Sequence, residues 1–237
     1  MSKLNVDQKN ICALLGDKKS DFIIPDYQRP YAWGKEECET LWEDIYEFAI
    51  PEGSADKFNK KDEYYLGSIV TFKNDDEVNE VIDGQQRLTT LILLLRAFYD
   101  NFKDAKEEGM IAIRNSIENC IWGTTEFRTI DKDSIKINSD VATDADRLDF
   151  IDILKNGECD NVDSKSNYNE NFKFFKEKIA KLSVRSLEAT KFITPRILNN
   201  CVVISIESDS SEKKSFCSGC KSNFICCTLF SLTFISL

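Results

Sequence analysis

The sequence contains no histidine in its 237 residues. Histidine is the commonest general base near neutral pH, and it is a common ligand of zinc and of other catalytic metals. Its absence excludes a hydrolase built on a Ser-His or Cys-His pair. It also excludes a nuclease metal site that contains histidine. Those classes of enzyme are therefore ruled out for this chain.

Positive charge is also scarce, because 31 Lys and Arg residues stand against 41 Asp and Glu residues, for a net charge of -10. The sequence-independent part of DNA affinity comes from clustered Lys and Arg, so this composition does not indicate a bulk binder of DNA phosphates. Any contact with nucleic acid would be local, or would belong to a partner. Nucleotides remain plausible ligands, because a few well-placed arginines and a helix N-terminus suffice to bind them.

Targeting and redox signals are absent as well. Residues 1–10 are polar and lack the apolar segment of a signal peptide, so a cytoplasmic protein is expected. Residues 225–237 are apolar but too short to span a bilayer, and no membrane partner is expected. Cysteines without paired spacing are expected to be reduced thiols, and they are Cys12, Cys38, Cys120, Cys159 and Cys201.

The apolar content of 42% and the abundance of Phe and Tyr are enough for one sizeable core. The spacing of apolar residues predicts a mixed α/β (α+β) fold. Its best-marked elements are a short strand at 22–25, an amphipathic helix at 35–49, a hairpin of strands at 64–72 and 78–82, and a long helix at 86–102. That long helix is apolar around most of its circumference, so it is predicted to be the central buried helix.

Other stretches give weaker signals. We expect a short helix at 7–15, helical stretches over 103–138 with a break near 123–125, and helices at 144–154 and 169–182. A strand is expected at 201–206, where the sequence reads CVVISI.

The segment Asp83-Gly84-Gln85-Gln86-Arg87 lies where the second hairpin strand gives way to the long helix. The first N–H groups of a helix are unpaired and carry the positive end of its dipole, so this junction can hold an anion. Arg87 adds a planar cation that matches phosphate geometry. Asp83 could hold a metal ion or act as a base, and the two glutamines could orient water or a base.

A simpler interpretation also fits this segment. In that interpretation Asp83 only caps the helix and Arg87 is a solvated residue of its first turn. Physical chemistry alone favours this capped junction, because such junctions are common.

A second candidate is the loop Gln28-Arg29-Pro30-Tyr31-Ala32-Trp33. Arg29 could pair with a phosphate, and the aromatic rings of Tyr31 and Trp33 could stack on a base or close a pocket. The alternative is an aromatic loop that fixes the following helix to the core. A third candidate is the cysteine-rich end, with Cys217, Cys220, Cys226 and Cys227, but its spacing lacks the second C-x-x-C of a zinc site.

Three blocks carry a family resemblance: IPDYQRPYAW at Ile24–Trp33, YLGSIV at Tyr65–Val70 and VIDGQQRLTTL at Val81–Leu91. In order and spacing they resemble the N-terminal domain of GmrSD-type, modification-dependent restriction endonucleases, and the last block is highly specific. The strand at 201–206 resembles a later strand of the same domain. The resemblance covers roughly residues 7–212.

The resemblance implies a ParB/sulfiredoxin-like core with added helices. It implies binding and hydrolysis of a nucleoside triphosphate, with Mg²⁺ or another divalent cation, coupled to restriction of modified DNA. Asp83, Gln85, Gln86 and Arg87 would be catalytic, with Asp83 also a metal ligand. The implied nucleotide-binding residues are Gln28, Arg29, Tyr31, Gly84, Arg87 and Thr89.

Two departures from the family pattern shape the expected organisation. Members usually continue into a helical region and a nuclease domain with a His-containing motif, so a nuclease would have to come from a separate chain. The composition shifts to Cys, Phe, Ser and Leu near the end. We therefore expect a nucleotide-handling domain at 1–212 and an aberrant, frameshifted tail at 213–237. The alternatives are a catalytically silent nucleotide- or DNA-binding module and a non-functional truncated product.

Overall fold

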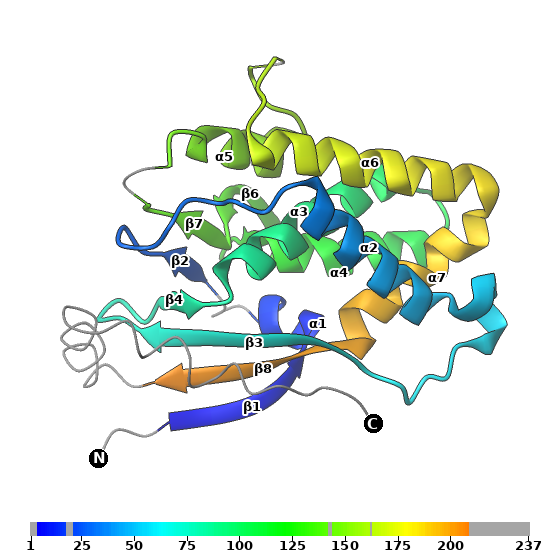
Figure 1. The fold of residues 1–237 in the computed structure, drawn as a ribbon, viewed down its shortest axis with the longest axis horizontal. Helices are drawn as coiled ribbons and strands as arrows, with labels where there is room; N and C mark the ends of the chain where they lie inside the picture. Colours follow the sequence, from blue (N-terminus) through cyan, green and yellow to red (C-terminus); the bar gives the residue numbers. More distant parts are fainter. Residues whose placement is uncertain (1–3, 18–20, 142–143, 162, 209–237) are drawn as a thin grey trace.

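The fold is mixed α/β, as predicted, and is built on one main sheet (Figure 1). The structure is a computed structural model that describes residues 4–17, 21–141, 144–161 and 163–208. Six strands form the sheet in the order β1-β8-β3-β4-β2-β7, and β5 and β6 form a separate pair. The six are β1 (Leu4–Asn10), β8 (Cys201–Ser208), β3 (Tyr64–Lys73), β4 (Asn79–Asp83), β2 (Phe22–Ile24) and β7 (Ile137–Ser139).

Three neighbouring strands of this sheet run in the same direction. β2 pairs in parallel with β4 on one side and with β7 on the other. Their C-terminal ends therefore reach the same edge of the sheet. The chain leaves that edge at three places: after Ile24, after Asp83 and after Ser139. Ligands of open α/β sheets commonly bind outside such strand ends, so the topology gathers the predicted motifs at one place.

Helix α3 (Gln85–Phe102) follows β4 and is the central buried helix, as predicted. Fifteen of its residues are buried, because the helix is covered on most of its circumference. α2 (Lys35–Ala49) has the predicted bounds, since its apolar residues recur with helical spacing and Pro51 follows it. The other long helices are α4 (Glu108–Ile121), α5 (Arg147–Asn156), α6 (Asn167–Arg185) and α7 (Leu187–Asn200).

In Figure 1 these helices lie on one side of the main sheet, with α5 and α6 farthest from β1. α3 packs against both α4 and α6, which places it in the middle of the helical layer. Within the described ranges, no helix is both long and apolar enough to cross a membrane.

The prediction of a helix over 7–15 is wrong in its first half. Those residues belong to β1, which pairs antiparallel with β8. Helix α1 (Ile11–Leu15) starts only after Asn10, whose side-chain oxygen accepts a hydrogen bond from the Ala13 N–H at 2.7 Å. Residues 7–10 are polar, so their own sequence does not favour a strand over a helix. The distant strand β8 decides the outcome, since Lys9 Nζ lies 2.6 Å from Glu207 Oε1.

The prediction for 103–138 is also wrong in its second half. α4 ends at Ile121, and the chain continues as β5 (Trp122–Thr124), β6 (Ile130–Ile135) and then β7. The helix α7, which contains Pro195, precedes β8 where only the strand was predicted. The predicted tail at 213–237 and its cysteines lie outside the described residues.

Candidate functional site

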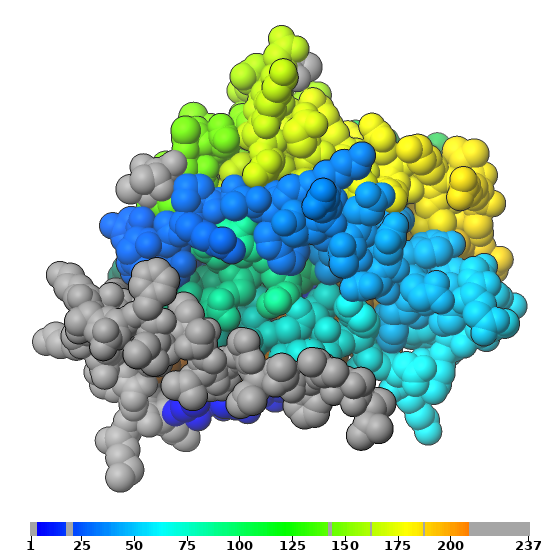
Figure 2. Space-filling view, viewed as in Figure 1, coloured from blue at the N-terminus to red at the C-terminus, as the bar shows by residue number. Residues whose placement is uncertain are grey.

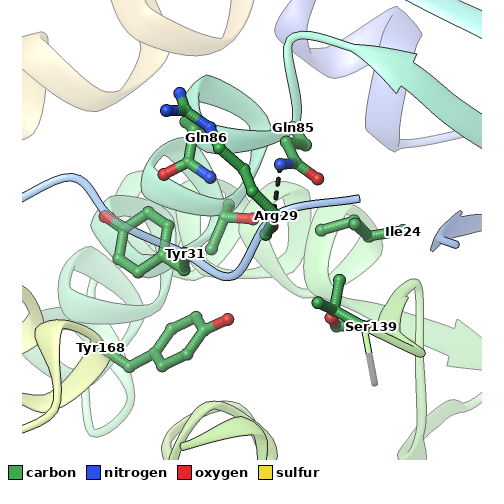
Figure 3. A pocket seen from close by; sticks show the side chains of 9 residues that line it. Ile24, Arg29, Tyr31, Gln85, Gln86, Ser139 and Tyr168 are labelled. Carbon is green, nitrogen blue, oxygen red and sulfur yellow. Dashed lines mark hydrogen bonds between the residues drawn. The ribbon is translucent and has the colours of Figure 1, made fainter. Parts of the chain in front are cut away.

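A small pocket of about 160 Å³, including its open mouth, lies at the shared edge of β2, β4 and β7. Its walls come from the end of β2, the loop after it, the first turns of α3, the end of β7 and α6. Figure 3 shows these side chains around one space. They are Ile24, Arg29, Tyr31, Gln85, Gln86, Thr89, Ser139, Val141 and Tyr168.

Gln86 holds the loop between β2 and α2 by its backbone. Its Oε1 accepts hydrogen bonds from the N–H groups of Ala32 at 2.7 Å and Trp33 at 3.1 Å, and its Nε2 donates to the Pro30 carbonyl at 3.1 Å. The residue is only 6% exposed. Backbone groups outside helices and sheets need such partners, so Gln86 fixes the path of residues 30–33.

Gln85 makes a similar bond but keeps one atom free. Its Nε2 donates to the Arg29 carbonyl at 3.0 Å (dashed in Figure 3), while its buried Oε1 has no partner within the described residues. The Ser139 hydroxyl is buried and without a partner in the same way. The two residues are 7% and 5% exposed. Both of these unsatisfied polar side chains line the pocket.

Two further side chains of the loop make contacts that fix its position. Gln28 Nε2 donates to the Ile82 carbonyl at 2.9 Å, which ties the loop to the end of β4. The Tyr31 hydroxyl lies 2.7 Å from Thr90 Oγ1 and accepts a hydrogen bond from Asn171 Nδ2 at 2.9 Å. Burial raises the pKa of the Tyr31 hydroxyl far above its ordinary value. Tyr31 therefore offers the pocket a neutral ring and not a free hydroxyl.

The loop nevertheless remains at the surface. Figure 2 shows the segment between β2 and α2, in blue, on the outside of the molecule. Arg29 is exposed, and no ion pair is found for it within the described residues. In Figure 3 its side chain points away from Ser139, past Gln86. A free guanidinium group thus stands at the rim of the pocket and not on its floor.

The junction before α3 is not capped by Asp83, so that alternative interpretation is wrong. The N-cap residue is Gly84, and no side chain caps the helix. Gly84 has φ of 87°, a left-handed conformation that favours glycine. A Cβ atom there would lie 2.8 Å from the Ser68 carbonyl oxygen. The Asp83 side chain is exposed and free of any hydrogen bond to the described residues.

Arg87 lies against the strand β3 on the other side of this junction. Its Nη1 donates to the Ser68 carbonyl at 3.1 Å. The guanidinium group passes directly over Gly67, where a Cβ atom would come within 2.6 Å of Arg87 Cζ. Gly67 has φ of 111°, so both its conformation and its close neighbour require glycine. The half-buried cation is thereby held beside the positive end of α3.

The structure separates the predicted residues into two adjoining groups. Arg29, Tyr31, Gln85, Gln86 and Thr89 line the pocket, whereas Asp83, Gly84 and Arg87 form the junction beside β3. Gln28 belongs to neither group, because its amide bonds to the end of β4.

Sequence reasoning missed several residues of the site. Ile24, Val141, Ser139 and Tyr168 complete the pocket walls, and Gly67 shapes the junction. Ile24 and Gly67 stand within the motif blocks, so their positions carried a signal. Ser139 and Tyr168 lie in no motif, and only the meeting of β7 and α6 with the loop reveals them.

The described part of the chain contains no group of three or more Cys, Asp or Glu side chains that could hold a metal ion. A single exposed carboxylate, that of Asp83, stands at the junction. Mg²⁺ commonly binds through one or two carboxylates together with substrate phosphates. The residues present fit a metal that arrives with a phosphorylated ligand, and they do not fit a metal held by the protein alone.

One family of known proteins matches the chain. The family model of the GmrSD restriction endonuclease, N-terminal domain, matches residues 11–218. The matched range contains the loop, the β3–β4 hairpin, the junction and the pocket, and it ends beyond residue 212, where the sequence suggested a boundary. No curated protein matches the chain.

Replacing Gln86 tests its hold on the loop. We expect Gln86→Glu to lower the free energy of unfolding at neutral pH by about 1–3 kcal/mol, because the bond to the Pro30 carbonyl is lost and a carboxylate is buried. Burial raises the pKa of the new carboxyl group in the folded protein. The lost stability should therefore return as the pH falls and that group becomes a donor again. Urea unfolding of both proteins from pH 7 to pH 4 measures this. An equal difference at every pH would contradict it.

The contact of Gly67 with Arg87 can be measured with a double-mutant cycle. Gly67→Ala should cost about 1–3 kcal/mol, because its φ of 111° is unfavourable for alanine. In an Arg87→Ala background the same change should cost less by about 0.5–3 kcal/mol, since the guanidinium group no longer blocks the new methyl group. Gly53→Ala is the matched control, because Gly53 also has positive φ but nothing lies near its Cβ position. Additive costs at Gly67 and Arg87 would show that the contact is absent.

Stability at alkaline pH should depend on Tyr168. Burial, and then the hydrogen bond to Asp144 at 2.6 Å, raise the pKa of its hydroxyl. The folded protein keeps this proton at a pH where the unfolded chain releases it, so the free energy of unfolding should fall as the pH rises above about 10. Tyr168→Phe should flatten this decline, and Tyr65→Phe, which removes an exposed hydroxyl, should not. Unfolding in urea between pH 8 and pH 11 gives both slopes. Parallel slopes for all three proteins would refute the role of Tyr168.

Proposed function

Because the chain belongs to the family of GmrSD restriction endonuclease N-terminal domains, we propose that it is the nucleotide-handling module of a modification-dependent DNA restriction system. The module binds a nucleoside triphosphate and hydrolyses it. The observation that carries this proposal is the junction before α3, where a helix N-terminus, a held arginine and an unengaged carboxylate meet. The resemblance further implies that the core is ParB/sulfiredoxin-like and that the protein works in the cytoplasm.

The phosphates lie at the start of α3 in this proposal. The first N–H groups of a helix have no intrahelical partner, and its dipole favours an anion there. α3 has no acidic residue in its first turn to compete with a phosphate. Gly84 allows a close approach of the backbone, and Arg87 supplies a bidentate donor. Arg29 adds a second cation from the rim of the pocket.

Asp83 provides the carboxylate for hydrolysis. It would hold Mg²⁺, which supplies charge neutralisation on the phosphates when it is bound. The free carboxamide oxygen of Gln85 can accept a hydrogen bond from the ligand. Three of the Gln86 amide's hydrogen-bonding positions are already used by the loop backbone. Gln86 therefore acts in this mechanism by holding residues 30–33 in place.

DNA and the nuclease enter through partners. The chain carries a net charge of -10 and lacks histidine, so strong contact with DNA phosphates and cleavage of DNA both belong elsewhere. A separate nuclease chain that responds to the nucleotide state of this module fits the proposal, and modified DNA is the signal that the system reads.

The second candidate is a nucleotide-binding module without turnover. Asp83 is a single carboxylate, and the described ranges hold no cluster of metal-binding side chains around it. Phosphate release by the purified protein, with Mg²⁺ and each of the four nucleoside triphosphates, separates the two functions. Release supports hydrolysis, whereas binding without release supports the silent module.

Loss of Arg87 should abolish most of the turnover. We expect Arg87→Ala to lower the rate of phosphate release about 10²–10³-fold, because one preorganised charge on the transferred phosphate is removed. Arg87→Lys should recover only part of the rate, since lysine cannot bind bidentately. Arg185→Ala is the control, because it removes the same charge from an exposed position in the last turn of α6. Arg87→Ala protein with the wild-type rate would remove Arg87 from the mechanism.

A further inference from the structure

Two of the five buried side-chain atoms without a hydrogen-bond partner in the described residues share one small pocket. They are Gln85 Oε1, at the start of α3, and Ser139 Oγ, at the end of β7. Buried polar atoms are nearly always paired in folded proteins, and exceptions often mark functional sites.

The orientation of the Gln85 amide is fixed by its other contact. Its Nε2 donates to the Arg29 carbonyl at 3.0 Å. A flipped amide would place two oxygens against each other, so the carbonyl oxygen must be the atom left free. The pocket therefore offers one pure acceptor, from Gln85, and one hydroxyl that can donate or accept, from Ser139.

The remaining walls favour a flat, uncharged group. Tyr31 and Tyr168 are stacked with ring centroids 4.7 Å apart, and Ile24 and Val141 are apolar. A phosphate or carboxylate would meet the partial negative charge of Gln85 Oε1. The exposed Arg29 side chain points away from Ser139, toward the rim (Figure 3). Arg29, the cation among the lining residues, thus points to the rim, whereas the neutral polar groups of Gln85 and Ser139 lie inside the pocket.

The size of the pocket limits what it can hold. Its empty space is only about 160 Å³, and this value includes the open mouth. It suits the edge of a single ring. That edge approaches from the open mouth of the pocket, where the Arg29 side chain stands.

We propose that this pocket recognises the nucleobase of the bound nucleotide through the base's hydrogen-bonding edge. A ring N–H or amino group donates to Gln85 Oε1, and the Ser139 hydroxyl pairs with the neighbouring acceptor of the base. The triphosphate extends outward past Arg29 to the start of α3 and Arg87. This assignment rests on the proposed nucleotide-binding function and adds the direction in which the ligand lies.

Calorimetric titration with a truncated ligand tests the assignment. The wild-type protein, Ser139→Ala and Thr194→Val are each titrated in Mg²⁺ with non-hydrolysable analogues of the four nucleoside triphosphates and with inorganic triphosphate, which has no base. Thr194 in α7 is the matched control, because its hydroxyl is also buried without a partner but does not line the pocket.

We expect Ser139→Ala to weaken binding of the preferred nucleotide about threefold to tenfold, the usual effect of losing one neutral hydrogen bond. Its affinity for inorganic triphosphate should equal that of the wild type. Thr194→Val should change neither affinity. The melting temperature of Ser139→Ala should not fall, because the deleted hydroxyl has no partner in the protein. That result separates a role in binding from a role in folding.

Four results would overturn the assignment. Unchanged nucleotide affinity in Ser139→Ala, or an equal loss for nucleotide and inorganic triphosphate, would remove the base from this pocket while leaving the proposed function in place. Inorganic triphosphate that binds the wild type as tightly as every nucleotide would do the same. A wild-type protein that binds no nucleotide would overturn the proposed function, and the base pocket with it.

Discussion

The site depends on how the backbone of residues 29–33 is satisfied. This segment lies between β2 and α2, in no helix or strand, so its N–H and C=O groups need partners from elsewhere. Gln85 and Gln86, at the start of α3, supply them with four hydrogen bonds between 2.7 and 3.1 Å. Two neighbouring glutamines therefore join the loop to the central helix. These hydrogen bonds give both glutamines of the motif a structural role that does not depend on any catalytic role.

The direction of the strands makes that contact available. β4, β2 and β7 are parallel neighbours, so the start of α3, the loop and Ser139 all leave the sheet at one edge. The buried hydroxyl of Tyr31 then connects the loop to α3 through Thr90 and to α6 through Asn171. The pocket lies between these parts, and the exposed Arg29 side chain stands at its rim.

Charge in the site is local, in contrast to the acidic chain. Arg87 is held over Gly67 beside the start of α3, and Arg29 stands free at the pocket rim. Arg87 belongs to the first turn of α3, at the positive end of the helix dipole. Such an arrangement favours a small polyanion over a long DNA backbone. With no histidine present, the proposed hydrolysis would rely on the Asp83 carboxylate for proton transfer and on arginine for charge stabilisation.

The sequence by itself determined the elements whose signals are local. The helices α2 and α3, the β3–β4 hairpin and the Gly84 junction follow from apolar spacing and turn residues within one short stretch. The tertiary structure decided the features that depend on distant partners. β1 is a strand because β8, at the far end of the described chain, pairs with it. Ser139 and Tyr168 join the site because β7 and α6 fold against the loop. The hydrogen bonds of Gln85 and Gln86 to the loop backbone were not predictable from the local sequence either, because their partners lie far away in the chain.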